Sequence, residues 1–237
     1  MIAIILSAGV GSRLNDITFD IPKPMIKYNN KPLLEHNLIK CVNAGIKDIF
    51  INIHHQKNII KDYFGDGSKW NCHISYSEEN TLLGTSGALK KISLLSSSQH
   101  YIVIYGDNYS TYNFKEIINF HNNSKCKMTI VSAKVNDPTG SGILNFDDNF
   151  RLLNFFEKPI NNLIYDSYYA NMGIYVIDRE LLKYIPNGFS DFGKNIIPDL
   201  LKKNVPIAIK LMKKNVIGID TPLLYHKHIK EDLNDLF

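Results

Sequence analysis

The sequence predicts an α/β protein with a mostly parallel central sheet, helices on both faces of that sheet, and extra strands in the C-terminal half. Its 237 residues are enough to bury a sizeable core without disulfide bonds or a structural metal ion. Hydrophobic residues make up 44% of the chain and charged residues 21%, as in ordinary globular proteins. In the first half, short apolar runs alternate with amphipathic segments. This alternation indicates βαβ units, and therefore parallel strands covered by helices.

Strands and helices alternate along the first 105 residues. The expected strands are short runs rich in β-branched residues, at 2–6, 48–53, 73–76 and 101–105. The expected helices are at 32–44, where Pro32 begins the helix and Gly45 follows it, and at 56–64 and 86–95. In open α/β sheets ligands bind beyond the carboxyl ends of the strands. The residues just after Leu6, Tyr105 and Ile219 are therefore the first candidates for a binding site.

After about residue 120 the pattern changes and strands predominate. Strands are expected at 128–134, 142–146, 151–157, 173–177 and 207–211, and helices at 192–202 and 221–233. No linker, repeat or low-complexity tract interrupts the chain. The sequence therefore predicts a single domain, residues 1–237, with one half at about 1–120 and another at about 121–237.

Composition and charge exclude several classes of protein. The net charge is only +4 and basic residues occur as isolated pairs, so a nucleic-acid-binding arm is not expected. No apolar run reaches the ~18 residues that cross a bilayer, and the first apolar run is too short for a signal peptide. The cysteines Cys41, Cys72 and Cys126 lack metal-ligand spacing and fit a reducing compartment. We therefore expect a cytoplasmic protein.

A glycine-containing loop, residues 7–14, directly follows the first expected strand. Its glycines would let the backbone approach a phosphate group and present N–H groups to it. Arg13 and Lys23 add a guanidinium and an ammonium group, which suit a polyphosphate. A dinucleotide-binding motif fits less well, because Leu14 replaces its third glycine and the second strand ends in Asn-Ile-His-His without an acidic residue.

Further motifs follow this loop along nearly the whole chain. Together they are Gly9–Leu14, Pro22–Met25, Leu83–Ala88, Gly106–Asp107, Glu157–Pro159, Asn171–Tyr175 and Asp220–Pro222. In this order they resemble the sugar-1-phosphate nucleotidylyltransferases, and most of all the short mannose- and D-glycero-D-manno-heptose-1-phosphate guanylyltransferases. The resemblance implies a Rossmann-like nucleotidyltransferase fold, with a nucleotide-binding first half and a sugar-phosphate-binding second half. It also implies the reaction of an NTP with a sugar 1-phosphate to give an NDP-sugar and pyrophosphate.

The resemblance implies roles for the charged residues. Arg13 would hold the β- and γ-phosphates, Lys23 would bridge the α-phosphate and the incoming phosphate, and Asp107 would bind Mg²⁺. Asp107 as a simple turn residue is the alternative. The implied nucleotide contacts are Leu6, Ser7, Ala8, Gly9, Gly11, Ser12, Arg13, Lys23, Glu79, Gly84 and Thr85, and the implied sugar-phosphate contacts are Gly142, Glu157, Lys158 and Asn171. The attacking phosphate is already ionised, so no side-chain nucleophile or base is expected.

The second expected ligand of Mg²⁺ is Asp220, where this chain departs from the family pattern. The family usually has Asp-x-Gly-Thr-Pro, but here Gly218 stands at the aspartate position and Asp220 directly precedes Thr-Pro. Related cytidylyltransferases carry their metal-binding aspartate directly before Thr-Pro. Capping of the last helix by Asp220 is the alternative.

Glu79 is the expected determinant of base choice, whereas its neighbour Glu78 is expected to face solvent. Uridylyl- and thymidylyltransferases commonly carry glutamine at the position of Glu79. An ionised glutamate only accepts hydrogen bonds, and guanine presents two donors side by side. We therefore expect GTP and mannose or manno-heptose 1-phosphate as substrates, for surface polysaccharide precursors. Gly106–Asp107–Asn108 instead resembles thymidylyltransferases, so glucose-1-phosphate thymidylyl- or uridylyltransferase is the alternative.

An inactive regulatory subunit that binds NDP-sugars is the alternative from a different class. Such subunits typically lack the arginine or lysine of the first loop, but Arg13 and Lys23 are both present. No nucleic-acid or membrane partner is expected, and the sequence leaves a homo-oligomer open. The adjacent histidines His54 and His55 have no carboxylate at metal-ligand spacing, so they are expected at the surface or in loops.

Overall fold

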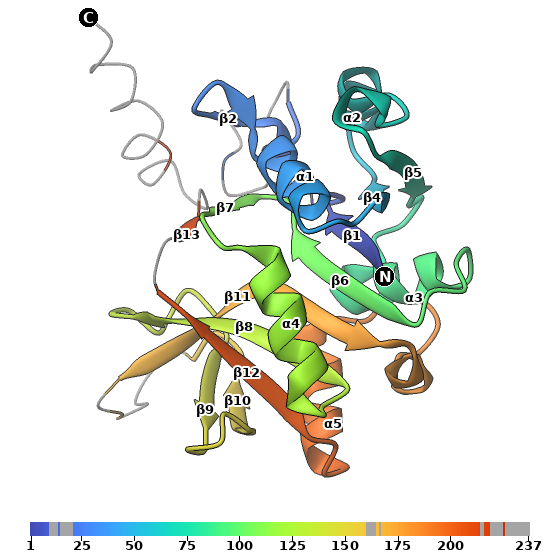
Figure 1. Ribbon diagram of the computed structural model, residues 1–237. Helices are drawn as coiled ribbons and strands as arrows, with labels where there is room; N and C mark the ends of the chain where they lie inside the picture. The colour runs from blue at the N-terminus through green and yellow to red at the C-terminus, as the bar shows by residue number, and fades with distance from the viewer. Residues whose placement is uncertain are drawn as a thin grey trace, which may run out of the picture. The chain divides into compact units, whose positions relative to one another are not determined.

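The computed structural model describes residues 1–9, 14, 21–159, 165, 167–213, 216–218 and 225, and for 216–218 it describes the backbone alone. The chain forms two compact units that are both discontinuous in sequence. The N-terminal unit comprises residues 2–82, 104–111 and 215–237, and the central unit comprises residues 1, 83–103 and 112–214. Strand β6 (His100–Tyr105) contributes to both (Figure 1).

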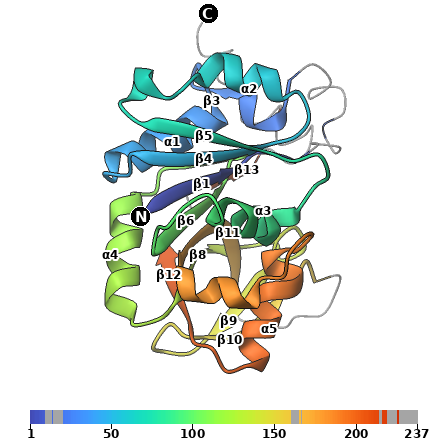
Figure 2. The same cartoon turned by 90° about the vertical axis from the view of Figure 1, so that its right-hand side faces the viewer.

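The N-terminal unit contains three parallel strands with β4 in the middle. They are β1 (Ile2–Leu6), β4 (Asp48–Ile53) and β5 (His73–Glu78), which lie side by side in Figure 2. Helix α1 (Leu33–Asn43) follows Pro32 and helix α2 (Lys57–Phe64) follows β4. The isoleucines of β1 and β4 are fully buried or nearly so, because a central parallel strand is covered on both faces.

Several short elements complete this unit. They are the 3-10 turns η2 (Lys23–Met25) and η3 (Ser68–Trp70), the pair β2 (Lys27–Tyr28) and β3 (Lys31–Pro32), and the pair β7 (Asn108–Ser110) and β13 (Val216–Gly218).

The central unit is built around a mixed sheet. Its strands are β8 (Met128–Val135), β9 (Ile143–Phe146), β10 (Leu152–Phe156), β11 (Tyr168–Asp178) and β12 (Ile207–Met212). Strand β11 pairs antiparallel with β8 and β9, whereas β12 pairs parallel with β8. Helix α4 (Phe114–Ser124) covers one face of this sheet and α5 (Ile197–Lys202) the other (Figure 2). Helix α3 (Gly84–Ser93), the 3-10 helix η4 (Arg179–Tyr184) and the π-helical turn η5 (Phe192–Ile196) complete the unit.

The structure confirms the α/β class and the order of the expected strands and helices. Strand β11 extends well beyond the expected 173–177, and the expected helix 192–202 begins as a π-helical turn. The helix expected at 221–233 lies outside the described residues except for Tyr225. Among the residues that the structure describes, no helix is long and apolar enough to span a membrane. The three cysteines are all free.

Helix α4 was not expected from the sequence. Its N-terminus is capped by the Asn113 side chain, which accepts a hydrogen bond from the Lys115 N–H at 3.0 Å. Its buried face consists of Phe114, Ile117 and His121. Only two of these three residues are apolar, because the third is a histidine. The helical pattern of apolar residues is therefore too brief to predict a helix from the sequence.

Candidate active site

The loop after β1 begins with a buried serine. The Ser7 N–H donates to the Asn52 Oδ1 at 2.7 Å, and the residue is 3% exposed. The Ser7 hydroxyl has no hydrogen-bond partner among the described residues. Ala8 is buried and Gly9 is exposed, whereas the expected phosphate contacts Gly11, Ser12 and Arg13 lie outside the described residues.

Gly106 brings the end of β6 against this loop. Its N–H donates to the Leu6 carbonyl at 2.8 Å. A Cβ at this position would lie 2.6 Å from the Ser7 Oγ and 2.9 Å from the Leu6 carbonyl oxygen, so only glycine allows the approach. Asp107, the next residue along the chain, therefore lies directly beside the loop after β1.

The expected catalytic lysine and metal-binding aspartate form an ion pair. The Lys23 Nζ lies 2.6 Å from the Asp107 Oδ2, with the lysine side chain 7% exposed and the aspartate side chain 32% exposed. Lys23 is held in η2, which begins after Pro22. A buried ammonium group needs a compensating charge, and Asp107 supplies it.

The strand that precedes the second expected metal ligand in sequence pairs with β7, which follows Asp107. Strand β13 pairs antiparallel with β7 so that Gly218 lies opposite Asn108, the residue after Asp107. Asp220 itself lies outside the described residues. Asp107 supplies a partly exposed carboxylate and Ser7 a buried hydroxyl, and Mg²⁺ prefers oxygen donors of this kind. The described oxygen donors therefore fit a divalent cation.

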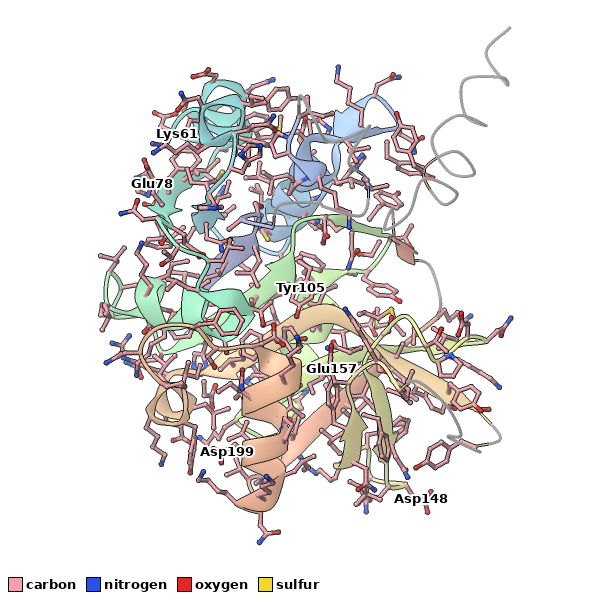
Figure 3. All side chains as sticks on the ribbon, turned by 180° about the vertical axis from the view of Figure 1, so that it is seen from behind. Lys61, Glu78, Tyr105, Asp148, Glu157 and Asp199 are labelled. Carbon is pink, nitrogen blue, oxygen red and sulfur yellow. The ribbon has the colours of Figure 1, made fainter. Side chains whose placement is uncertain are left out.

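Glu79 and Glu78 face different surroundings. Glu79 is 5% exposed, and its Oε1 accepts a hydrogen bond from the Asn52 Nδ2 at 2.8 Å. Glu78 instead forms ion pairs with Lys57 and Lys61 at the surface (Figure 3). These pairs hold the pKa of Glu78 at about 2, mainly through hydrogen bonds from the two lysines. Glu78 thus lies at the surface, as expected, whereas Glu79 is buried.

In the central unit, three of the four expected sugar-phosphate residues come together. The Asn171 N–H donates to the Gly142 carbonyl at 2.8 Å. A Cβ at Gly142 would lie 3.2 Å from the Glu157 Oε2, so the carboxylate lies against the glycine backbone. The Asn171 Nδ2 donates to the Tyr175 hydroxyl at 2.6 Å. Lys158 is exposed and has a positive φ of 44°.

A second glycine forms the other wall around Glu157, which Figure 3 labels. A Cβ at Gly193 would lie 2.2 Å from the Glu157 Oε2, so a larger residue would displace the carboxylate. Burial, together with the nearby Asp191, raises the pKa of Glu157, whereas Lys158 and Lys194 oppose the rise. A carboxylate in such surroundings is a strong acceptor for hydroxyl groups.

The Leu-Gly-Thr motif is joined to this part of the central unit. Gly84 has φ of +72°, and a Cβ there would lie 2.4 Å from the Ser190 carbonyl oxygen. The Thr85 hydroxyl donates to the Asp191 Oδ2 and accepts from the Phe192 N–H, both at 2.9 Å. Gly84 and Thr85 therefore hold the segment that carries Asp191 and Gly193.

Several of these residues did not emerge from the sequence. Asn52, Asp191 and Gly193 belong to none of the motifs. Asn52 had one sequence signal, because a polar residue interrupts the apolar run of β4. The close contact of Gly193 with Glu157 left no such signal.

A histidine–aspartate cluster in the central unit also escaped the sequence analysis. The Asp178 Oδ1 lies 2.7 Å from the His100 Nδ1 and 3.1 Å from the His121 Nε2. Lys127 approaches the other carboxylate oxygen at 3.4 Å. The donor atoms of the two histidines and the aspartate converge as those of a metal site could. Because hydrogen bonds and the lysine already satisfy the carboxylate, we interpret the cluster as a polar network.

Comparisons with known proteins find a family match over most of the chain. The family model described as nucleotidyl transferase matches residues 2–224. The mannose-1-phosphate guanylyltransferase catalytic subunit beta of Drosophila melanogaster is 31% identical over 215 residues, 88% of this chain and 57% of that protein. The UTP–glucose-1-phosphate uridylyltransferase of Synechocystis is 33% identical over 221 residues, 87% of this chain and 56% of that protein. The chain thus spans just over half the length of these relatives.

Two solved structures are similar over almost the whole chain. HddC from Yersinia pseudotuberculosis, complexed with GMP-PN, matches with a TM-score of 0.80 and 25% identity, covering 98% of this chain and 99% of that one. A Bacillus anthracis protein described as a glucose-1-phosphate thymidylyltransferase matches with a TM-score of 0.85 and 23% identity, covering 98% and 95%. The second likeness concerns the fold alone.

Proposed function

Because the chain belongs to the nucleotidyl transferase family, we propose that it joins the nucleotidyl group of an NTP to a sugar 1-phosphate and releases pyrophosphate. The observation that carries this proposal is the ion pair of the buried Lys23 with the partly exposed Asp107, beside the loop after β1. Both charges suit a reaction between two polyanions, in which positioning and charge neutralisation supply most of the catalysis.

The proposed reaction is an in-line displacement. A phosphate oxygen of the sugar 1-phosphate forms a bond to the α-phosphorus, and the bond from that phosphorus to the β-phosphate oxygen breaks with its electron pair. Lys23 would neutralise charge on the α-phosphate and the attacking phosphate, and Arg13 would hold the β- and γ-phosphates. Backbone N–H groups of residues 7–12 would contact the phosphates.

Asp107 and Asp220 would hold Mg²⁺, which when bound would neutralise charge on the phosphates. The pairing of β7 with β13 supports Asp220 as the partner of Asp107, since it places Gly218 opposite Asn108. In the central unit, Glu157 would accept hydrogen bonds from sugar hydroxyls, together with contacts from Gly142 and Asn171. Lys158 would contact the sugar phosphate. The relatives named for mannose 1-phosphate support mannose or a manno-heptose as the sugar.

GTP is the proposed nucleotide. The buried Glu79 carboxylate would accept hydrogen bonds from guanine N1–H and N2–H₂. Uracil and thymine would instead place a carbonyl group, which is also an acceptor, opposite the carboxylate. The HddC complex with GMP-PN supports guanine. The uridylyltransferase relative supports the second candidate, a glucose-1-phosphate uridylyl- or thymidylyltransferase.

Pyrophosphate release tests the proposal directly. The protein is incubated with MgCl₂, each of GTP, UTP, dTTP, ATP and CTP, and a panel of sugar 1-phosphates. We expect release only when an NTP, a sugar 1-phosphate and Mg²⁺ are all present, and the fastest release with GTP. Binding of NDP-sugars without any release would favour an inactive regulatory subunit. NAD binding without NTP turnover would contradict the proposed reaction.

A further inference from the structure

We propose that Asn52 is a positioning residue for base selection, whose side-chain amide orients the Glu79 carboxylate toward the nucleobase and ties it to the loop after β1. The inference rests on the proposed nucleotidyl transfer and on the proposed contact of Glu79 with the base. No motif of the sequence includes Asn52.

Asn52 is an unusual residue for its place in the fold. It lies in β4, the middle strand between β1 and β5, and it is 4% exposed. Its strand neighbours Ile51 and Ile53 are fully buried. Asparagine is disfavoured in strands, and a buried amide costs folding free energy unless its hydrogen bonds are satisfied. A residue whose strand propensity and polarity do not suit its buried position is expected at a functional site.

The orientation of the Asn52 amide follows from its neighbours. The Ser7 backbone N–H can only donate, so the amide oxygen must face it, at 2.7 Å. The amide nitrogen therefore faces Glu79 and donates to its Oε1 at 2.8 Å. One side chain thus connects the loop after β1 with the proposed base-reading carboxylate.

The backbone of Glu79 is held from two sides. Its N–H donates to the Ile53 carbonyl at 2.8 Å, and its carbonyl lies 2.7 Å from the His54 Nδ1. The position of the Cα is therefore set by β4 and the residues after it. The direction of the carboxylate depends on side-chain contacts, among which the hydrogen bond from Asn52 is buried.

An amide is the group that can accept from Ser7 and donate to Glu79 at once. Aspartate at position 52 would retain the acceptor but, when ionised, place a second negative charge against Glu79 and could not donate to it. Alanine would leave the Ser7 N–H and the Glu79 carboxylate without this partner. Both changes should therefore reduce the preference of Glu79 for a base that presents two donors.

The test measures the dissociation constants of GTP and UTP by isothermal titration calorimetry, without sugar phosphate. It compares the wild type with Asn52→Asp, Asn52→Ala, Glu79→Gln and the double variant Asn52→Ala/Glu79→Gln. The dissociation constant of UTP divided by that of GTP measures the preference for guanine. We expect both Asn52 variants to reduce this ratio by at least ~10-fold, since unpaired buried polar groups discriminate strongly. In the double variant, Asn52→Ala should add nothing to the effect of Glu79→Gln, because it acts through that residue.

Ser77→Ala is the matched control. Ser77 is the register partner of Asn52 in β5, is 2% exposed, and has a hydroxyl without a hydrogen-bond partner among the described residues. Its substitution should leave the ratio unchanged. Asn52→Asp should regain part of the ratio as the pH is lowered, because the introduced carboxyl group, once protonated, can again donate to Glu79.

Three outcomes would overturn the role of Asn52: equal weakening of GTP and UTP, fully additive effects in the double variant, or no binding of either nucleotide by the wild type. Absence of pyrophosphate release with every NTP would instead refute the proposed reaction. The binding ratios would still decide the role of Asn52 in that case.

Discussion

At the scale of single residues, the pairing of Lys23 with Asp107 joins positions 84 residues apart in sequence. Leaving a buried ammonium group without its partner typically costs about 3–5 kcal/mol, so each charge stabilises the position of the other. The same two charges are those that the proposed reaction requires, one toward the phosphates and one toward a cation. The Ser7–Gly106 contact places this pair beside the loop after β1.

Asp107→Asn should reduce the rate of pyrophosphate release by at least ~100-fold, as expected when a main charge-stabilising group is lost. The amide oxygen can still accept a hydrogen bond from Lys23, so the variant should fold. The turnover rate and the thermal unfolding midpoint are measured together. Normal turnover at low Mg²⁺ concentration would contradict the proposed metal contact, whereas an unfolded variant would show that the ion pair is chiefly structural.

At the scale of elements, two turns of backbone enclose the Glu157 carboxylate. The segment before β9 contributes Gly142 and the π-helical turn η5 contributes Gly193. An added Cβ would lie 3.2 Å and 2.2 Å, respectively, from the Glu157 Oε2. Asp191 begins η5, and its Oδ1 accepts from the Gly193 N–H at 3.0 Å. The carboxylate is therefore positioned by packing of backbone against side chain.

Gly193→Ala should raise the KM for the sugar 1-phosphate by at least ~10-fold, because displacement of a positioning group by about an ångström is costly to catalysis. The KM for the NTP should change little. Gly140→Ala is the matched control, since no atom lies within 4 Å of the added Cβ. Both variants are compared by steady-state kinetics. An unchanged KM for the sugar phosphate in Gly193→Ala would remove Glu157 from the proposed sugar site.

At the scale of the whole molecule, the polar network around Asp178 links α4, β6, β8 and β11. The His121 Nδ1 lies 2.8 Å from the Thr129 hydroxyl and its Nε2 lies 3.1 Å from Asp178. Burial lowers the pKa of His121 despite the neighbouring carboxylate. Burial alone would raise the pKa of Asp178, but hydrogen bonds from His121 and His100 lower it.

These shifts predict that the free energy of unfolding falls as the pH is lowered. The unfolded chain binds a proton to His121 more readily than the folded chain, so stability is lost as the pH drops below about 6.5. Protonation of Asp178 also lowers the stability of the fold as the pH falls below about 4, because the pKa of Asp178 is lower in the folded chain than in the unfolded chain. His36, whose pKa is lowered mainly by burial, contributes in the same direction as His121.

His121→Gln should flatten the fall in stability between about pH 7 and pH 5, since the titrating group is removed. Urea unfolding gives the free energy at each pH, and the same measurement at about pH 8 gives the pH-independent cost of the lost contacts. A slope equal to that of the wild type would show that other groups dominate.

The sequence by itself determined the fold class, the order of most strands and helices, and the motif order that identifies the family. These features depend on local chemistry: β-branched runs favour strands, and glycine with basic residues after a strand favours phosphate binding. The interpretation of Glu78 as the solvent-facing member of the pair Glu78–Glu79 also came from the sequence. The site residues that lie in the motifs remain predictions from that local pattern.

Only the tertiary structure decided which distant residues meet. The contacts of Asn52 with Ser7 and Glu79, of Gly193 with Glu157, and of His100 and His121 with Asp178 join residues from different elements. Such contacts depend on strand register and on the close approach of backbones. No periodicity encodes them, because a one-residue change of register would replace every partner.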